Sequence, residues 1–301
     1  MSNPVTILTI ENADLQVKVI PELGGKISSL LDKKTGHECF FQNPKAEYAV
    51  PALYDSFSAY DASGFDDAFP NIDASWSDVN GRTVHFPDHG EIWTLPMTAQ
   101  ADDNSIILAG QCRVLPCDYR KTVAVEGRRM RISYAIRNIG DEAIPFMWTM
   151  HCLVNVDEHT RLILPANPGK AENVFAGGDL GEVGALLDVD GAPDLRAMPA
   201  PGAMRKYYLA DAVSEGLCGY EFPREGLRLM VRFDKDVLPY LGMWCTMGGF
   251  RGDVNAALEP SSAYYDSIDI ARVRHRLPLI APGDEVRFEL LFSLCDIKEG
   301  E

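Results

Sequence analysis

The chain has 301 residues, 46% of them hydrophobic and 24% charged, which is the composition of a globular protein that can bury a large core. Its formal net charge of −16 repels phosphate backbones and anionic lipid, so we expect no nucleic acid and no membrane among its partners. The seven cysteines contain no C-x-x-C pair, which argues against a structural zinc site. Several lie in apolar runs, and this indicates buried, reduced thiols in a cytoplasmic protein.

Strand patterns dominate the chain from one end to the other. Residues 5–10 and 15–20 predict a hairpin, because the second run alternates apolar and polar side chains and a four-residue turn precedes it. Further strand-like runs occupy residues 26–31, 105–109, 119–125, 130–138 and 286–294. We expect short helices only around residues 179–187 and 266–272. The pattern predicts an all-β protein.

No segment rich in Ser, Pro or Gly divides these strands into two groups. Residues 167–202 are small, acidic and loop-forming, but strand patterns of the same character resume on both sides. We interpret this stretch as a surface excursion rather than a linker. The sequence therefore predicts a single domain over residues 1–301.

Three side chains are candidates for acid–base chemistry. His89 lies in a turn within residues 87–93, where an imidazole can stand at the mouth of a cleft. His151 lies in an apolar strand, where a histidine is costly unless its nitrogens are paired, and a satisfied core histidine is the simpler alternative. Glu259 ends an apolar run before a proline; partial burial would raise its pKa toward that of a general base, whereas the alternative is a surface glutamate.

Other residues could contact a polar ligand. Asp66 and Asp67 lie in a glycine-led loop, and carboxylates accept several hydrogen bonds from hydroxyl groups. Trp244 is either a core residue or a stacking platform. His85 and His89 have the spacing of two metal ligands on a helix, but the proline between them disfavours a helix. We find no phosphate-binding loop, dinucleotide fingerprint or nucleophile elbow, and we expect no cofactor.

Several segments, in order along nearly the whole chain, resemble the galactose mutarotase-like superfamily, the aldose 1-epimerases. The resemblance rests on a glycine pair followed by a strand and turn, the loop before the first histidine, the His-Gly segment, the Asn-x-Gly turn with its histidine strand, the Glu-Pro pair and a C-terminal signature. These correspond to residues 21–36, 64–70, 87–93, 138–151, 258–260 and 281–294.

The resemblance implies a large β-supersandwich of two twisted, mainly antiparallel sheets with few short helices and a sugar in an open cleft. It implies an isomerase that interconverts the α and β anomers of a free sugar without a cofactor. Glu259 would be the base and His151 the acid. The residues expected to bind the sugar are His89, Asp66, Asp67 and Trp244. The sequence leaves open whether the chain forms a homodimer.

The sequence departs from the family pattern at two places. Family members commonly carry an arginine in the loop before the first histidine, and this chain has none there. The hydroxyl-binding aspartate of the family also has no clear counterpart, Asp211 being a poorly matching position. A non-catalytic carbohydrate-binding protein on the same scaffold is therefore an alternative. A metal-dependent isomerase using His85, His89 and His151 is another.

Overall fold

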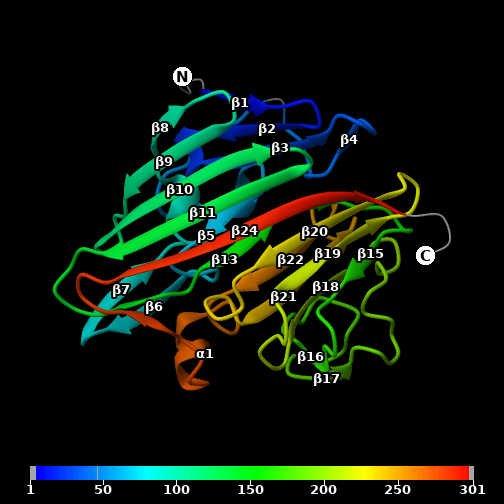
Figure 1. Ribbon diagram of the computed structural model, residues 1–301. Helices are drawn as coiled ribbons and strands as arrows, with labels where there is room; N and C mark the ends of the chain where they lie inside the picture. Colours follow the sequence, from blue (N-terminus) through cyan, green and yellow to red (C-terminus); the bar gives the residue numbers. More distant parts are fainter. Residues whose placement is uncertain (1–4, 46, 298–301) are drawn as a thin grey trace.

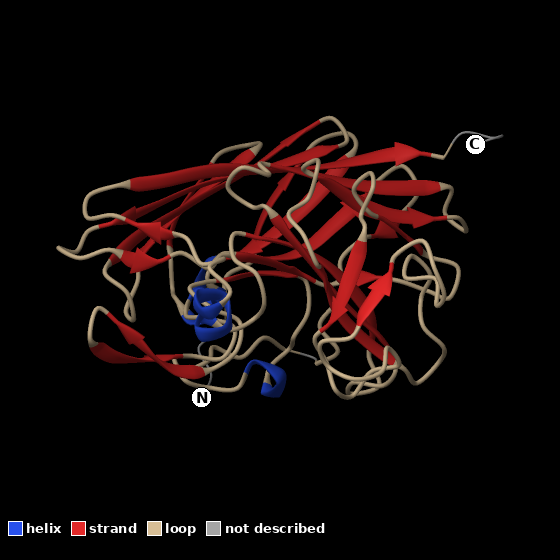
Figure 2. Cartoon of the chain, turned by 90° about the horizontal axis from the view of Figure 1, so that it is seen from below, coloured by secondary structure: helices blue, strands red, loops and turns tan. Residues whose placement is uncertain are grey.

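The computed structural model describes residues 5–45 and 47–297. Within these residues, two large antiparallel sheets lie face to face, with one short α-helix at their side (Figures 1 and 2). The predicted β-supersandwich is confirmed. The described part of the chain contains no helix with the length and hydropathy that crossing a bilayer would require.

The larger sheet has twelve strands in the described residues. Their order is β1 (Leu8–Glu11), β2 (Leu15–Ile20), β3 (Lys26–Asp32), β5 (Phe65–Ala68), β13 (Thr149–Cys152), β22 (Val254–Ser261), β21 (Tyr240–Met247), β18 (Met204–Leu209), β16 (Lys170–Asn173) and β17 (Leu186–Asp188). Two short strands lie off this path, with β4 (His37–Glu38) beside β3 and β14 (Val154–Asn155) beside β22.

The smaller sheet has eight strands in the described residues. Their order is β15 (Arg161–Ile163), β19 (Leu217–Phe222), β20 (Leu227–Phe233), β24 (Glu285–Asp296), β11 (Arg129–Asn138), β10 (Cys117–Glu126), β9 (Ser105–Gln111) and β8 (Thr98–Ala101). The remaining strands form two pairs, β12 (Ile144–Pro145) with β23 (Leu279–Ile280) and β6 (Ser75–Val79) with β7 (Arg82–Phe86). The helices are α1 (Ile268–Val273) and the 3₁₀ turns η1 (Pro21–Leu23), η2 (Phe57–Ala59) and η3 (Ile92–Thr94).

The alternation of side chains along each strand builds the core. In β11, Met130 and Ile132 are buried between the sheets, whereas Arg129 and Arg131 point to solvent from the other face. Successive side chains of a strand leave opposite faces of the sheet, so one face of β11 packs against the larger sheet. The same division into an inner and an outer face holds for β10, its neighbour.

The structure agrees with some of the sequence predictions for local elements and contradicts one of them. The predicted hairpin forms as β1 and β2, and α1 overlaps the predicted helical segment 266–272 and ends one residue beyond it. The prediction of a helix at residues 179–187 is wrong, because that segment consists of turns leading into β17. Gly181 and Gly184 have φ values of 84° and 88°, which a right-handed helix does not allow.

A buried ion pair joins the two sheets. Lys121 of β10 is completely buried, and its Nζ lies 3.0 Å from Oδ2 of Asp67 in β5. The hydroxyl of Tyr134 in β11 donates a 2.8 Å hydrogen bond to Oδ1 of Asp67. Asp67, a predicted sugar ligand, thus points into the core from β5. It does not line the cavity described below.

Replacing Lys121 by methionine is expected to lower the free energy of unfolding by about 3–5 kcal/mol, because it leaves the Asp67 carboxylate buried without its counter-charge. Adding Asp67→Asn should restore part of this loss. Urea denaturation of the wild type and both variants measures the effect. Arg131→Met, which removes an exposed ion pair with Glu289, is the control and should change stability little. An equally small effect of Lys121→Met would contradict the role given to the ion pair.

Candidate active site

A cavity of about 380 Å³ opens on the face of the larger sheet that points away from the smaller sheet. Strands β13, β22, β21 and β18 supply its floor through His151, Glu259, Trp244 and Lys206. Loops supply its walls, including the turn that carries His89. The cavity therefore collects side chains that lie far apart in the sequence on one sheet surface.

The pairing of β13 with β22 brings the predicted acid and base together. Thr149 lies opposite Ser261, and the same register resumes between β14 and β22. Two residues along, His151 therefore lies opposite Glu259. Directly opposed residues of an antiparallel pair have Cβ atoms about 4.5–5.5 Å apart, so one ligand can contact both side chains.

The two residues belong to a row that crosses the larger sheet. His151 is paired with Asp66 on β5, and Glu259 is paired with Gly242 on β21. Gly242 is paired in turn with Tyr208 on β18. Because the strands alternate, all these positions face the cavity side of the sheet.

Glu259 is fully buried within this row. A Cβ atom on Gly242 would lie 3.1 Å from a carboxylate oxygen of Glu259 and 3.0 Å from the Tyr208 ring, so the glycine leaves room for both. Neither carboxylate oxygen has a hydrogen-bond partner among the described residues. Burial raises the pKa of the Glu259 carboxyl to about 7, an effect that Lys206 opposes and Asp266 strengthens. A carboxylate of this kind suits a general base near neutral pH.

His151 and His89 form a contacting pair. Their ring centroids are 4.8 Å apart and their planes stand at 84°. His151 is buried, and its Nδ1 has no hydrogen-bond partner in the part of the chain that the structure describes. Burial lowers the pKa of His151 well below the ordinary histidine value, and the nearby positive charges of His89 and Lys206 lower it further. The His151 ring is therefore neutral at pH 7.

His89 differs from His151 because it has a carboxylate partner. Its backbone has φ of 57°, and its Nδ1 lies 2.7 Å from Oδ1 of Asp88. Burial by itself would raise the pKa of the Asp88 carboxyl. The contact with His89 opposes this effect and holds the pKa of Asp88 below its usual range. The ring of Phe57 stacks on His89 at 4.2 Å. Trp93 is buried and donates a hydrogen bond to the Asp88 carbonyl, so it supports this turn from behind.

Sequence reasoning missed a second polar cluster in the cavity. Nζ of Lys206 lies 2.6 Å from Oδ2 of Asp266, and the hydroxyl of Tyr208 donates a 2.7 Å hydrogen bond to Oδ1. Although burial opposes a charged amine, Asp266 and Glu259 raise the pKa of Lys206. The local signal that could have revealed this cluster is the lysine that lies among the aromatic residues of β18. Asp266 lies in a turn directly before α1 and has no comparable signal.

The remaining predicted ligands lie in different places. Trp244 lines the cavity, with Phe175 and Phe250 edge-on to its ring at 5.8 Å each. Asp66 does not line it; its Oδ2 lies 2.5 Å from Nζ of Lys26 in a buried ion pair. Asp211 is exposed and also lies outside the cavity lining.

An arginine does reach the loop in which the family pattern places one, but it comes from the opposite side. Arg251 follows β21 and donates hydrogen bonds to the carbonyls of Ser58, Tyr60 and Asp61. Its Nε lies 3.3 Å from Oδ2 of Asp253. Because these donors contact the backbone of residues 58–61, Arg251 fixes the cavity wall.

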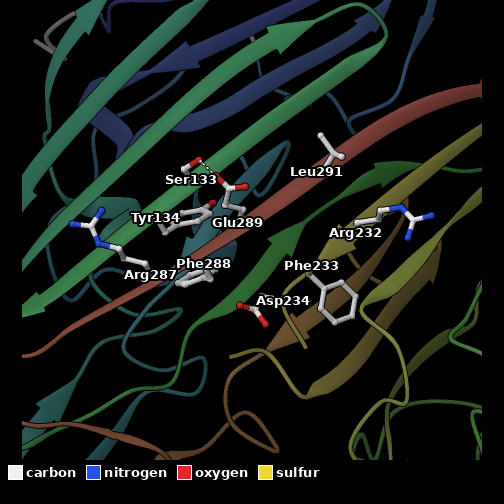
Figure 3. A pocket seen from close by; sticks show the side chains of 9 residues that line it. All are labelled: Ser133, Tyr134, Arg232, Phe233, Asp234, Arg287, Phe288, Glu289 and Leu291. Carbon is white, nitrogen blue, oxygen red and sulfur yellow. Dashed lines mark hydrogen bonds between the residues drawn. The ribbon is translucent and has the colours of Figure 1, made fainter. Parts of the chain in front are cut away.

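A second hollow lies where β20 separates from β24, beside β11 (Figure 3). Its residues include Tyr134 and Phe288 as well as the charged side chains of Arg287 and Glu289. The Glu289 carboxylate accepts a 2.7 Å hydrogen bond from Ser133, which lowers its pKa. No histidine lines this hollow among the described residues, so the first cavity is the better candidate for acid–base chemistry.

Comparisons with known proteins agree with the fold. A family described as "Domain of unknown function (DUF5107)" matches residues 2–84, and no curated protein matches the sequence. A protein from Synechocystis sp. PCC 6803 matches in structure with a TM-score of 0.78 at 17% identity, over 98% of this chain and 97% of that one. An Escherichia coli K12 protein, provisionally described as an aldose 1-epimerase, has a TM-score of 0.76 at 17% identity, over 97% and 99%.

A galactose mutarotase-like protein from Lactobacillus casei ATCC 334 has a TM-score of 0.73 at 15% identity, over 96% of this chain and 100% of that one. The chain has the galactose mutarotase-like fold. The resemblance stated from the sequence is confirmed at this level. Since identities are 17% or lower, these matches concern the fold, and the chemistry has to be argued from the site.

The histidines of this chain do not converge on a metal site. His85 lies outside the cavity, stacked between Tyr54 and Trp76, whereas His89 and His151 line it. The described residues contain no group of three or more His, Cys, Asp or Glu side chains placed to hold a metal ion. The hypothesis of a shared metal on His85, His89 and His151 therefore has no geometric support.

Proposed function

We propose that the protein is an aldose 1-epimerase that interconverts the anomers of a free sugar. The observation that carries the proposal is the position of His151 and Glu259 side by side on the floor of one cavity, with a Glu259 pKa of about 7. A base that is ionised near neutral pH and a nitrogen donor beside it are the two groups that ring opening requires.

In the proposed reaction, Glu259 removes the proton of the anomeric hydroxyl. The electron pair forms the aldehyde C=O bond as the bond between C1 and the ring oxygen breaks, and His151 donates a proton to that oxygen. Rotation about the C1–C2 bond then presents the other face of the aldehyde. The reverse proton transfers close the ring and restore both side chains.

The neutral state of His151 determines how it acts. With Nδ1 buried, Nε2 is the nitrogen that can reach a sugar, and its N–H donates to the ring oxygen. A neutral imidazole can serve as such an electrophile when its environment lowers its pKa. His89, which is oriented by Asp88, would form hydrogen bonds with the oxygens near the anomeric carbon.

The charge of the cavity indicates an uncharged sugar. The cavity is lined by Asp73, Asp88, Asp253, Glu259 and Asp266, and Lys206, which also lines it, is already paired. A phosphate or carboxylate group would be repelled by this set of carboxylates. Trp244 offers an apolar surface for the C–H face of a pyranose ring.

The proposal is tested by NMR measurement of anomer exchange over a panel of neutral, phosphorylated and acidic sugars, corrected for the buffer rate. We expect exchange with neutral sugars only. We also expect kcat/KM to rise about tenfold per pH unit below pH 7 and to level off above it, because Glu259 must be ionised and neutral His151 needs no further proton.

Two outcomes would contradict this account. Saturable sugar binding without exchange above the buffer rate would indicate a carbohydrate-binding protein. Exchange that declines above pH 7 would show that an imidazolium ion is the acid, in place of neutral His151.

A further inference from the structure

Three aromatic rings are stacked on the surface outside the cavity. His85 lies in the middle, 4.2 Å from the ring of Trp76 and 4.4 Å from that of Tyr54, with interplanar angles of 4° and 7°. Trp76 and Tyr54 remain 67% and 54% exposed. We call this group the aromatic stack. No step of the proposed reaction uses it.

The aromatic stack is held by the fold. Trp76 and His85 are directly opposed across the β6–β7 hairpin. Ser77 of this hairpin donates a 2.9 Å hydrogen bond to Asp269 of α1, and Arg272 of α1 donates a 2.6 Å bond to the carbonyl of Asp78. In Figure 1 the hairpin lies close to α1 at one end of the molecule. The rings therefore form a fixed apolar surface that loses little entropy on binding.

Each residue of the aromatic stack is three positions along the chain from a residue that lines the cavity. Tyr54 is three residues from Phe57, Trp76 is three residues from Asp73, and His85 is three residues from Asp88. Phe57, Asp73 and Asp88 all line the cavity. Three residues span at most about 10–11 Å, so the Cα atom of each stack residue lies within that distance of the Cα atom of a residue that lines the cavity. A second sugar ring that is linked to a ring in the cavity can extend over this distance.

The end rings of the stack suit a sugar. Because His85 covers their inner faces, Trp76 and Tyr54 each present one outer face to solvent. The C–H face of a pyranose packs on such a ring, and the aromatic surface provides apolar contact without requiring a charged ligand. Asp73, which lines the cavity three positions before Trp76, is exposed and can accept hydrogen bonds from hydroxyl groups.

We propose that the aromatic stack of Tyr54, His85 and Trp76 binds a second pyranose ring, so that the preferred substrates are neutral oligosaccharides with a free reducing end. This inference rests on the proposed function: the reducing-end ring occupies the cavity between Glu259 and His151, and the next ring packs on the stack.

The test compares a monosaccharide with disaccharides that carry it at the reducing end, with glucose, maltose and cellobiose as the first set. We expect wild-type kcat/KM for a disaccharide to exceed that for glucose about tenfold, the effect of one good aromatic contact. Trp76→Ala or Tyr54→Ala should remove most of this preference and change kcat/KM for glucose less than twofold. Ile107→Ala, an exposed apolar residue of the smaller sheet, is the control and should change neither value.

Equal losses on glucose and disaccharides, or no loss on either, would overturn the inference while leaving the proposed function intact. If the wild type exchanges no sugar, the proposed function fails, and saturation-transfer NMR of maltose and cellobiose binding then decides about the stack. Binding that Trp76→Ala abolishes supports it, and no binding of either disaccharide overturns it. A wild-type dimer that Trp76→Ala converts to a monomer would also overturn it, because the stack would then be a subunit contact.

Discussion

Glu259→Gln is expected to lower kcat for anomer exchange by about 10²–10⁴-fold, the range that a positioned general base supplies. Glutamine keeps the shape of the side chain but cannot accept the proton of the anomeric hydroxyl. KM should change little, because hydrogen bonding to the sugar is largely retained. NMR exchange rates at pH 8, where the wild-type carboxyl is ionised, measure the effect.

The same substitution has a second expected consequence that shows whether the fold is intact. The folded-state pKa of Glu259 is about 7, above its ordinary value of 4.5, so the stability it contributes is present below pH 4.5 and is lost as pH rises through 7. Glutamine does not titrate. Glu259→Gln should therefore have a higher Tm than the wild type at pH 8, and the two should converge near pH 4.5.

Glu289→Gln, on the outer face of the smaller sheet, is the matched control and should leave turnover unchanged. Near-wild-type exchange in Glu259→Gln would overturn the assignment of the base. An inactive variant with a lowered Tm at pH 8 would instead attribute the loss of activity to disturbed packing.

His151→Asn is expected to lower kcat by about 10²–10⁴-fold with a smaller change in KM, because it removes the proton donor to the ring oxygen. His89→Asn should mainly raise KM, since His89 holds the sugar without transferring a proton in the proposed reaction. Steady-state NMR exchange kinetics over a range of sugar concentrations separate kcat from KM.

Asp88→Asn provides a further check on these roles. The Asp88 carboxylate contacts Nδ1 of His89 and orients its ring. Asp88→Asn should therefore raise KM, as His89→Asn does. A larger loss of kcat in His89→Asn than in His151→Asn would exchange the roles of the two histidines. Such a result would place the acid on the ring that has a carboxylate partner.

The sequence predicted the fold class because it depends on local patterns, and it supplied three candidates for acid–base chemistry whose roles stay a prediction. Alternating runs such as residues 130–138 specify strands with one buried face, and β11 forms there. His89, His151 and Glu259 were recognised from their immediate neighbours and their order. The cavity unites all three.

The predictions that failed or fell short depend on which way a side chain points and on what it meets. Asp66 and Asp67 are adjacent, so they leave opposite faces of β5, one toward Lys26 and the other toward Lys121. Residues 179–187 are acidic and apolar enough to suggest a helix, but they form turns around two glycines.

The amino-acid sequence by itself indicated an all-β chain, since strand-like runs recur from one end to the other, whereas the two-sheet sandwich was implied by the resemblance to a family. It also determined which residues could carry protons. Only the tertiary structure decided their chemistry, because the register of β13, β22 and β21 sets His151 opposite Glu259 and leaves space at Gly242 for the carboxyl. The resulting burial raises the pKa of Glu259 and lowers that of His151. This burial depends on how distant segments pack, so neighbouring residues in the sequence do not predict it.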